Sequence, residues 1–392
     1  MAEDGRMKIL MSLPQEVRHL IEILNSQKKQ AYAVGGCVRD FLMGKSPADY
    51  DMTTSATPDE TISILEAAGV RTIPTGIKHG TISAYLDKKI YEITTFRTDG
   101  EYKNSRHPES VSFTDKLSDD LVRRDFTINA MAADIDGNIY DIFGGVDDIN
   151  KKIIRAVGDP YKRFSEDALR ILRAVRFSSR LGFEIEANTY NAARSLVGNL
   201  QNISIERKIS ELSGILLSDG AQIGVEMLFQ IGAMEHIIRG ASLPSMNISS
   251  APKTFECRMA ALLSATPEVD LTALKLSNKQ VKDISLLLKA PEFEENDVCA
   301  RKILRNYKDL AIDVCLLYGK NECADLVKEQ IKLDPCVSIG KLSVNGNDIA
   351  LLGFEKRNIS KILNFALEGV IIDPSLNEKD RLIQYILNNY TE

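Results

Sequence analysis

The chain has 392 residues, too many for one ordinary hydrophobic core, and its 44% hydrophobic and 27% charged residues are usual for a globular protein. No apolar run is long enough to span a bilayer and the N-terminus lacks a signal-peptide core, so we expect a cytoplasmic protein with no membrane partner. The net charge of −6 argues mildly against a nucleic-acid partner, and the six cysteines form no Cys-x-x-Cys pair of the kind found in zinc sites.

The N-terminal third of the chain mixes helical and strand patterns. Apolar residues at helical spacing predict an amphipathic helix over 8–30, and Thr57-Pro58-Asp59-Glu60 has the capping signals that begin a second helix. The polar, turn-rich stretch 99–111 predicts a mobile loop. We expect strands over 31–34, 50–53, 81–86 and 89–96, and a hairpin over 131–140. Together these elements predict a small mixed sheet.

From about residue 118 to the C-terminus the pattern is almost entirely helical. Glycines and prolines interrupt it at intervals, and one helix is predicted from Ser165 through Phe177. The chain shows no fixed-period repeat. The fold class is therefore α+β, with a small α/β head followed by a long all-α remainder.

The most informative segment is Gly35-Gly36-Cys37-Val38-Arg39-Asp40, followed closely by Asp49-Tyr50-Asp51. On an extended strand Asp49 and Asp51 point to the same face, where paired carboxylates can hold Mg²⁺ against a nucleotide triphosphate. The glycines let the backbone approach the phosphates, and Arg39 can neutralise charge there. A lone Asp-x-Asp usually marks a solvated turn, but the glycine-rich segment before it favours a metal site.

A second segment, Arg123-Arg124-Asp125, stands at the entrance to the apolar stretch 126–132. Adjacent guanidinium groups can clamp phosphate or ribose oxygens through paired hydrogen bonds. A surface ion pair that leads into a buried segment explains the same residues equally well. Both interpretations stay open from the residues alone.

In the predicted helix, Asp167, Arg170 and Arg173 recur every three residues along one face, and Arg176 continues the row. Ion pairing along a solvated helix face is the commoner reason for such spacing. The functional alternative is phosphate or base binding, since the surrounding segment 151–180 is strongly basic although the whole chain is acidic.

Base chemistry gives this row a specific use. Cytosine and adenine each present an amine donor next to a ring-nitrogen acceptor, whereas uracil and guanine present the reverse order. The carboxylate of Asp167 beside the guanidinium of Arg170 would therefore fit C and A and reject U and G. Each such contact is worth roughly 1–3 kcal/mol of discrimination.

Taken in order, the motifs resemble those of the class II tRNA nucleotidyltransferase/poly(A) polymerase family, in its Gram-positive CCA-adding branch. They are Gly-Gly-x-Val-Arg-Asp, Asp-x-Asp, Arg-Arg-Asp-Phe-Thr-Ile-Asn-Ala, Asp-x-x-Gly-Gly and Glu-Asp-x-x-Arg-x-x-Arg. The resemblance implies a seahorse-shaped chain with a nucleotidyltransferase head over 1–142, a neck over 143–200, and a helical body and tail over 201–315 and 316–392. It also implies untemplated addition of C, C and A to tRNA from CTP and ATP, with no protein partner.

The resemblance also implies roles for individual residues. Asp49 and Asp51 would hold Mg²⁺ for a two-metal phosphoryl transfer, with Glu92 as a candidate third carboxylate. The triphosphate and ribose contacts would be Gly36, Arg39 and Arg124. The base-reading pair would be Asp167 and Arg170, with Arg173 and Arg176 in support.

Three other functions are consistent with parts of the sequence. A polymerase that adds only the two cytidines and a poly(A) polymerase are the nearest, and the intact loop 99–111 favours full CCA addition over the first of these. A non-catalytic RNA-binding protein is more distant, because it would be expected to have lost Asp49 or Asp51.

Overall fold

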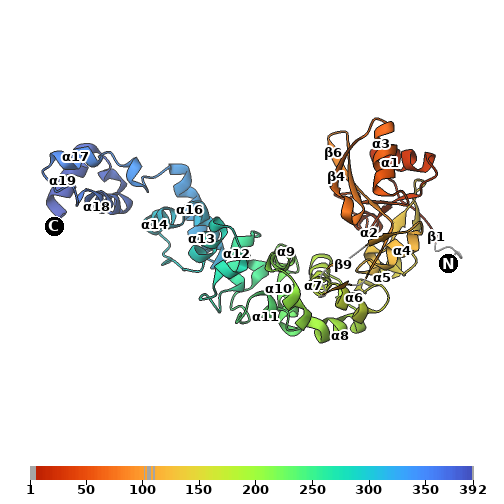
Figure 1. Cartoon of the computed structure of the whole chain (residues 1–392). Coiled ribbons are helices and arrows are strands. Elements are labelled where there is room, and N and C mark those ends of the chain that lie inside the picture. Colours follow the sequence, from red (N-terminus) through yellow and green to blue (C-terminus); the bar gives the residue numbers. More distant parts are fainter. Residues whose placement is uncertain (1–5, 101, 104–106, 109–110, 391–392) are drawn as a thin grey trace. The chain divides into compact units, whose positions relative to one another are not determined.

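The protein is described here by a computed structural model that covers residues 6–100, 102–103, 107–108 and 111–390. The chain divides into two compact units, Met1–Arg239 and Gly240–Glu392. The first holds the sheet and several helices and the second is helical (Figure 1). Within the described ranges, no helix has the length and apolar character needed to cross a membrane.

A mixed eight-stranded sheet forms the head. Its order is β1-β12-β11-β2-β3-β6-β5-β4, and every neighbouring pair is antiparallel except β3 with β6. The strands are β1 (Arg6–Leu10), β2 (Ala31–Val34), β3 (Met52–Thr54), β4 (Arg71–Gly76), β5 (Thr81–Leu86), β6 (Lys89–Thr95), β11 (Ala132–Ala133) and β12 (Asn138–Tyr140). This architecture confirms the predicted α+β class. The parallel pair aligns the start of β3 with the middle of β6, which positions the site described below.

The start of the chain differs from the prediction of one helix over 8–30. Residues Arg6–Leu10 form β1, which pairs with β12, and the helix α1 covers only Gln15–Ser26. Pro14 precedes that helix, where its fixed φ and missing N–H are tolerated. Pairing with β12 is a long-range contact, so local helical spacing did not reveal it. The capping box at Thr57 and Glu60 is present as predicted.

The other helices of the first unit lie around the sheet and continue beyond it. They are α2 (Gly36–Leu42), α3 (Pro58–Ala67), α4 (Leu117–Val122), α5 (Gly145–Lys151), α6 (Pro160–Glu166), α7 (Leu169–Leu181), α8 (Ala187–Leu196), α9 (Ile205–Leu216), α10 (Ala221–Gln230) and α11 (Met234–Ile237). The short parallel pair β13 (Ile153–Ile154) and β14 (Glu184–Ile185) was not predicted. Helices α1 and α3 pack on each other beside the strands (Figure 1).

The segment predicted as a mobile loop contains short strands, two at its ends and two within it. They are β7 (Arg97–Asp99), β8 (Tyr102–Lys103), β9 (His107–Pro108) and β10 (Val111–Phe113), with β7 paired to β10 and β8 to β9. The rest of the predicted loop, at residues 101, 104–106 and 109–110, lies outside the described residues.

The helix predicted from Ser165 is broken at Asp167. Helix α6 ends at Glu166 and α7 begins at Leu169, and Asp167 between them has an extended backbone with φ −137° and ψ 103°. Its side-chain Oδ1 accepts a hydrogen bond from the N–H of Leu169 at 3.0 Å. Aspartate commonly stabilises a helix start in this way, and that local bond competes with helix continuation.

The second unit is all-α in the described residues, as predicted. Its helices are α12 (Phe255–Leu262), α13 (Asn278–Leu287), α14 (Asp297–Tyr307), α15 (Ala311–Leu317), α16 (Asn321–Leu333), α17 (Gly346–Leu351), α18 (Ile359–Ile372) and α19 (Lys379–Asn389). Val344, Ile349 and Ile362 belong to a buried cluster that joins its last three helices.

Candidate nucleotide-transfer site

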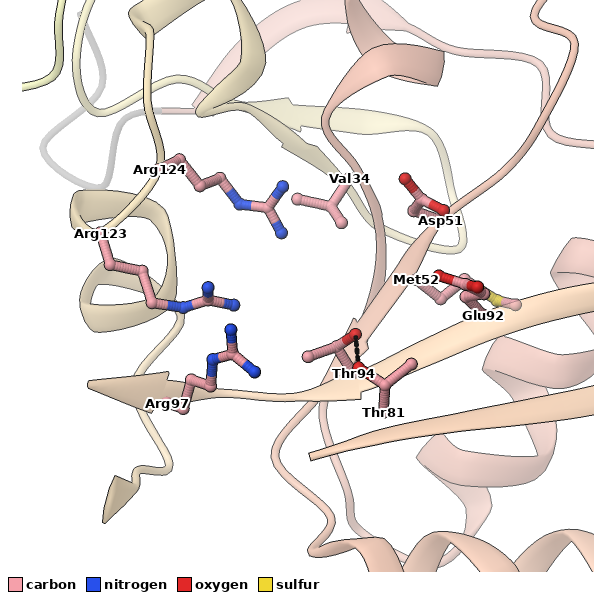
Figure 2. A pocket seen from close by; sticks show the side chains of 9 residues that line it. All are labelled: Val34, Asp51, Met52, Thr81, Glu92, Thr94, Arg97, Arg123 and Arg124. Carbon is pink, nitrogen blue, oxygen red and sulfur yellow. Dashed lines mark hydrogen bonds between the residues drawn. The ribbon is translucent and has the colours of Figure 1, made fainter. Parts of the chain in front are cut away.

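A cavity of about 210 Å³ opens on the head sheet, with acidic side chains on one side and basic ones on the other (Figure 2). It is lined by Val34, Asp51, Met52, Thr81, Glu92, Thr94, Arg97, Arg123 and Arg124. The floor comes from β5 and β6, and the basic wall comes from β7 and from the residues that follow α4. A cavity with carboxylates on one side and guanidinium groups on the other suits a ligand with several phosphates and bound metal cations.

The register of the sheet explains the acidic side. Met52 pairs with Ile93 in the parallel β3–β6 ladder, so Asp51 and Glu92 are neighbours one residue earlier on the two segments. In Figure 2 both carboxylates lie together, opposite the arginines. Neighbouring positions of adjacent strands face the same side of a sheet, and this arrangement supports Glu92 as a partner of Asp51.

Asp49 and Asp51 both precede β3, which begins at Met52, so the prediction that the pair lies on a strand is wrong in detail. Asp49 is exposed and does not line the cavity. Asp51 is also exposed, but the pKa of its carboxyl is raised because the surrounding protein displaces water from it. The positive charge of Arg124 lowers this pKa, and the negative charge of Asp49 raises it further. Within the described part of the chain, no three His, Cys, Asp or Glu side chains are already arranged around a point that could hold a metal.

Asp120 organises the basic side and was missed by sequence reasoning. It is fully buried, and its Oδ1 accepts hydrogen bonds from Nε and Nη2 of Arg123 at 3.0 and 2.6 Å. Its Oδ2 accepts from Arg124 Nη2 at 3.1 Å and from the Thr53 hydroxyl at 3.2 Å. Burial alone would raise the pKa of Asp120, but the two arginines outweigh it and the pKa lies below its ordinary value.

The glycine-rich turn is shaped by Gly35 rather than by Gly36. Gly35 has φ +80° at the start of α2, and a Cβ there would come within 3.1 Å of Arg124 Nη1. Arg39 lies on α2 but is buried, and it donates to Asn129 Oδ1 at 2.7 Å and to Asp40 Oδ1. Its guanidinium also lies 5.4 Å from the Phe177 ring centre. These contacts link the turn to helix α7, and Arg39 is not part of the cavity wall.

The predicted base-reading residues are close together but bonded to other partners. Asp167 Oδ2 accepts from Arg207 Nη2 at 3.0 Å. Arg170 Nη1 donates to Glu166 Oε2 at 2.9 Å. Other donor bonds of Arg170 reach the backbone carbonyls of Arg163 and Arg123, so this side chain links helix α7 to the segment that lines the cavity.

The other two arginines of the predicted row, Arg173 and Arg176, each pair with a carboxylate. Arg173 Nε donates to Asp125 Oδ2 at 2.7 Å. Arg176 Nε lies 2.6 Å from Oε2 of Glu211, which is on α9. Glu211 and Arg207 lie outside all the sequence motifs, and their charges and four-residue spacing were the only available signal.

The Asp125 carboxyl predicts a measurable pH dependence. Although burial alone would raise the pKa of Asp125, Arg173 and hydrogen bonds from Asn129 and the Phe126 N–H lower it from 3.8 to about 2. The ionised form therefore stabilises the fold by about 2 kcal/mol above the ordinary pKa, and this contribution disappears as the pH falls through about 2. Asp125→Asn should lower the free energy of unfolding in urea at pH 7 by at least that amount. The gap from wild type should shrink as the pH falls from about 4; a gap that stays constant would contradict this role.

Comparisons with known proteins identify the relatives of this chain. Residues 31–155 match the poly A polymerase head domain family, and residues 182–243 match a family described as the probable RNA and SrmB-binding site of polymerase A. The CCA-adding enzyme of Staphylococcus epidermidis is 33% identical over 395 residues, covering 95% of this chain and 97% of the relative. That of Enterococcus faecalis is 34% identical over 95% of this chain and 96% of the relative.

The chain belongs to the CCA-adding enzyme family. The structure of the Bacillus stearothermophilus CCA-adding enzyme in complex with CTP is 32% identical, with a TM-score of 0.85, and the match covers 96% of this chain and 98% of that one. The Thermotoga maritima CCA-adding enzyme complexed with tRNA shares the fold, with 21% identity and a TM-score of 0.70 over 96% of each chain. The resemblance found in the ordered motifs is therefore confirmed, and the protein is a nucleotidyltransferase of this family.

Proposed function

We propose that this enzyme adds C, C and A in turn to the 3′ end of tRNA, using CTP and ATP and no nucleic-acid template. The observation that carries the proposal is the full-length similarity to a CCA-adding enzyme whose structure holds CTP. The cavity supports it, because carboxylates face a row of arginines across a space suited to a polyphosphate. We further propose that the enzyme acts in the cytoplasm, where its tRNA substrate would be processed.

We assign the metal site to Asp49 and Asp51, with Glu92 as a third carboxylate. The donor set fits Mg²⁺, since all its ligands are hard oxygens, whereas thiolate or imidazole ligands would favour zinc. A bound metal would supply Lewis-acid activation of the tRNA terminal hydroxyl and neutralise charge on the leaving pyrophosphate. The shared register of Asp51 and Glu92 supports this assignment.

Arg124 is proposed to bind the triphosphate, held in place by Asp120. Gly36, which begins α2, and Arg39, which is buried against Asn129, are proposed to complete this triphosphate and ribose site from the neighbouring turn. The guanidinium of Arg124 can donate to phosphate oxygens through nitrogens that Asp120 leaves available. Its positive charge also favours ionisation of Asp51, which keeps that carboxylate ready for a cation.

The base is proposed to be read by Asp167 and Arg170, supported by Arg173 and Arg176. This role requires Arg170 to exchange some of its present bonds for the base edge, while Asp167 uses the lone pairs that its two present bonds leave free. We retain the division into head (1–142), neck (143–200), body (201–315) and tail (316–392) as a functional proposal. In it, body and tail hold the tRNA through backbone phosphates and helical shape.

Replacing Asp167 or Arg170 by Ala should relax the choice of base. Each change removes a polar contact worth roughly 1–3 kcal/mol, so the ratio of kcat/KM for CTP over UTP should fall about 10- to 100-fold. The measurement is steady-state addition to tRNA lacking CCA with each of the four nucleotides. Arg194→Ala, an exposed change on α8, is the matched control. Unchanged selectivity in both site variants would refute the base-reading proposal.

A further inference from the structure

Arg207 of helix α9 fixes the orientation of the Asp167 carboxylate. The two oxygens of Asp167 have separate partners: Oδ1 accepts from the Leu169 N–H and Oδ2 accepts from Arg207, each at 3.0 Å. The last torsion of an aspartate side chain is broad and weakly restrained by itself. Two hydrogen bonds to different oxygens, from groups on two helices, hold the carboxylate plane in one orientation.

Helix α9 is well placed to act as this support. It packs against α7 within the first compact unit, so the relation between the two helices belongs to one packed body. Four residues after Arg207, Glu211 lies on the same face and pairs with Arg176. One face of α9 therefore places the guanidinium of Arg207 beside Asp167 and the carboxylate of Glu211 beside Arg176.

Arg207 keeps one terminal nitrogen available for a further bond. In the described residues, Nη1 is buried and has no hydrogen-bond partner. Buried donors are rarely left unsatisfied.

We propose that Arg207 is a specificity-determining positioning residue, which holds Asp167 so that its free lone pairs face the base edge. The proposal rests on the base-reading role of Asp167 stated above. A fixed carboxylate accepts from the exocyclic amine of C or A and repels the oxygen that U or G presents at that place. A carboxylate that is free to turn loses both effects. Binding of C and A weakens, and U and G are no longer repelled, so the discrimination between the two pairs of bases falls.

The test uses Arg207→Met and Arg207→Lys in the full-length enzyme. With tRNA lacking CCA, Arg207→Met should lower the CTP-over-UTP ratio of kcat/KM about tenfold or more, the expected value of one charge-assisted hydrogen bond. The KM for CTP should rise while the KM for tRNA stays unchanged. Arg207→Lys should keep most of the selectivity, because an ammonium group can still donate to Oδ2. Arg194→Met on α8 should behave as wild type.

A double-mutant cycle distinguishes the inference about Arg207 from the base-reading proposal on which it rests. In an Asp167→Ala background, Arg207→Met should cause no further loss of selectivity, because its partner is gone. If Asp167→Ala relaxes selectivity but Arg207→Met and Arg207→Lys do not, the inference about Arg207 is wrong while base reading stands. If Arg207→Met slows all four nucleotides equally, or adds its full effect to Asp167→Ala, Arg207 is merely structural and the inference is overturned. If Asp167→Ala leaves selectivity intact, the base-reading proposal itself fails.

Discussion

Asp51→Asn should reduce the rate of nucleotide addition by about a thousandfold or more while the enzyme stays folded and binds tRNA. Asparagine has the same shape as aspartate but no negative charge, so it cannot balance a divalent cation. A lost metal ligand is expected to cost several kcal/mol of transition-state stabilisation, and about 4 kcal/mol corresponds to a factor of a thousand. Single-turnover addition of labelled CMP measures the rate, and filter binding measures affinity for tRNA.

Asp59→Asn is the matched control, because Asp59 is an exposed carboxylate on α3 that does not line the cavity. It should leave both measurements unchanged. Glu92→Gln tests the third carboxylate in the same assay and should be strongly impaired as well. Wild-type turnover by Asp51→Asn would end the metal assignment, whereas normal turnover by Glu92→Gln would remove only that residue from it.

Asp120→Ala should be the most destabilising single change near the site. It leaves Arg123 and Arg124 without their shared buried carboxylate, and breaking such a pair costs about 3–5 kcal/mol of folding free energy. The KM for CTP should also rise about tenfold or more, because Arg124 would no longer be held at the cavity. Urea unfolding gives the first quantity and steady-state kinetics the second.

The neighbouring Asp119→Ala provides the comparison. Asp119 lies on the same helix, is only half-buried and accepts a hydrogen bond from the Thr114 hydroxyl at 2.9 Å. It should lose no more than about 1 kcal/mol and bind CTP normally. Equal losses for the two variants would show that Asp120 has no special part in the basic wall.

The sequence predicted elements that rest on local signals. The strand Ala31–Val34, the capping box at Thr57 and the hairpin over 131–140 depend on neighbouring residues, and all are present. Errors occurred where distant contacts decide the outcome. Strand β1 exists because β12 pairs with it, and helix α6 ends because Asp167 bonds to the next helix rather than continuing the first.

In the candidate site, too, residues in local motifs were predicted and residues that act through distant contacts were not. Asp51 and Arg124 were predicted from motifs, and both line the cavity. Asp120, Glu211 and Arg207 were not predicted to act there. Asp120 is a buried partner of residues three and four positions later, a spacing that is common on any helix surface. Arg207 reaches Asp167 across 40 residues of chain, and no local pattern reports such a contact.

Sequencing of the reaction products gives a direct test of ordered CCA addition. A tRNA that ends before the CCA sequence is incubated with the purified enzyme, Mg²⁺ and all four nucleotides, and the 3′ ends are then sequenced. We expect nearly all extended molecules to end in CCA, with no U or G and no further growth. Products that stop at CC, carry long runs of A, or show no extension at all would contradict this expectation.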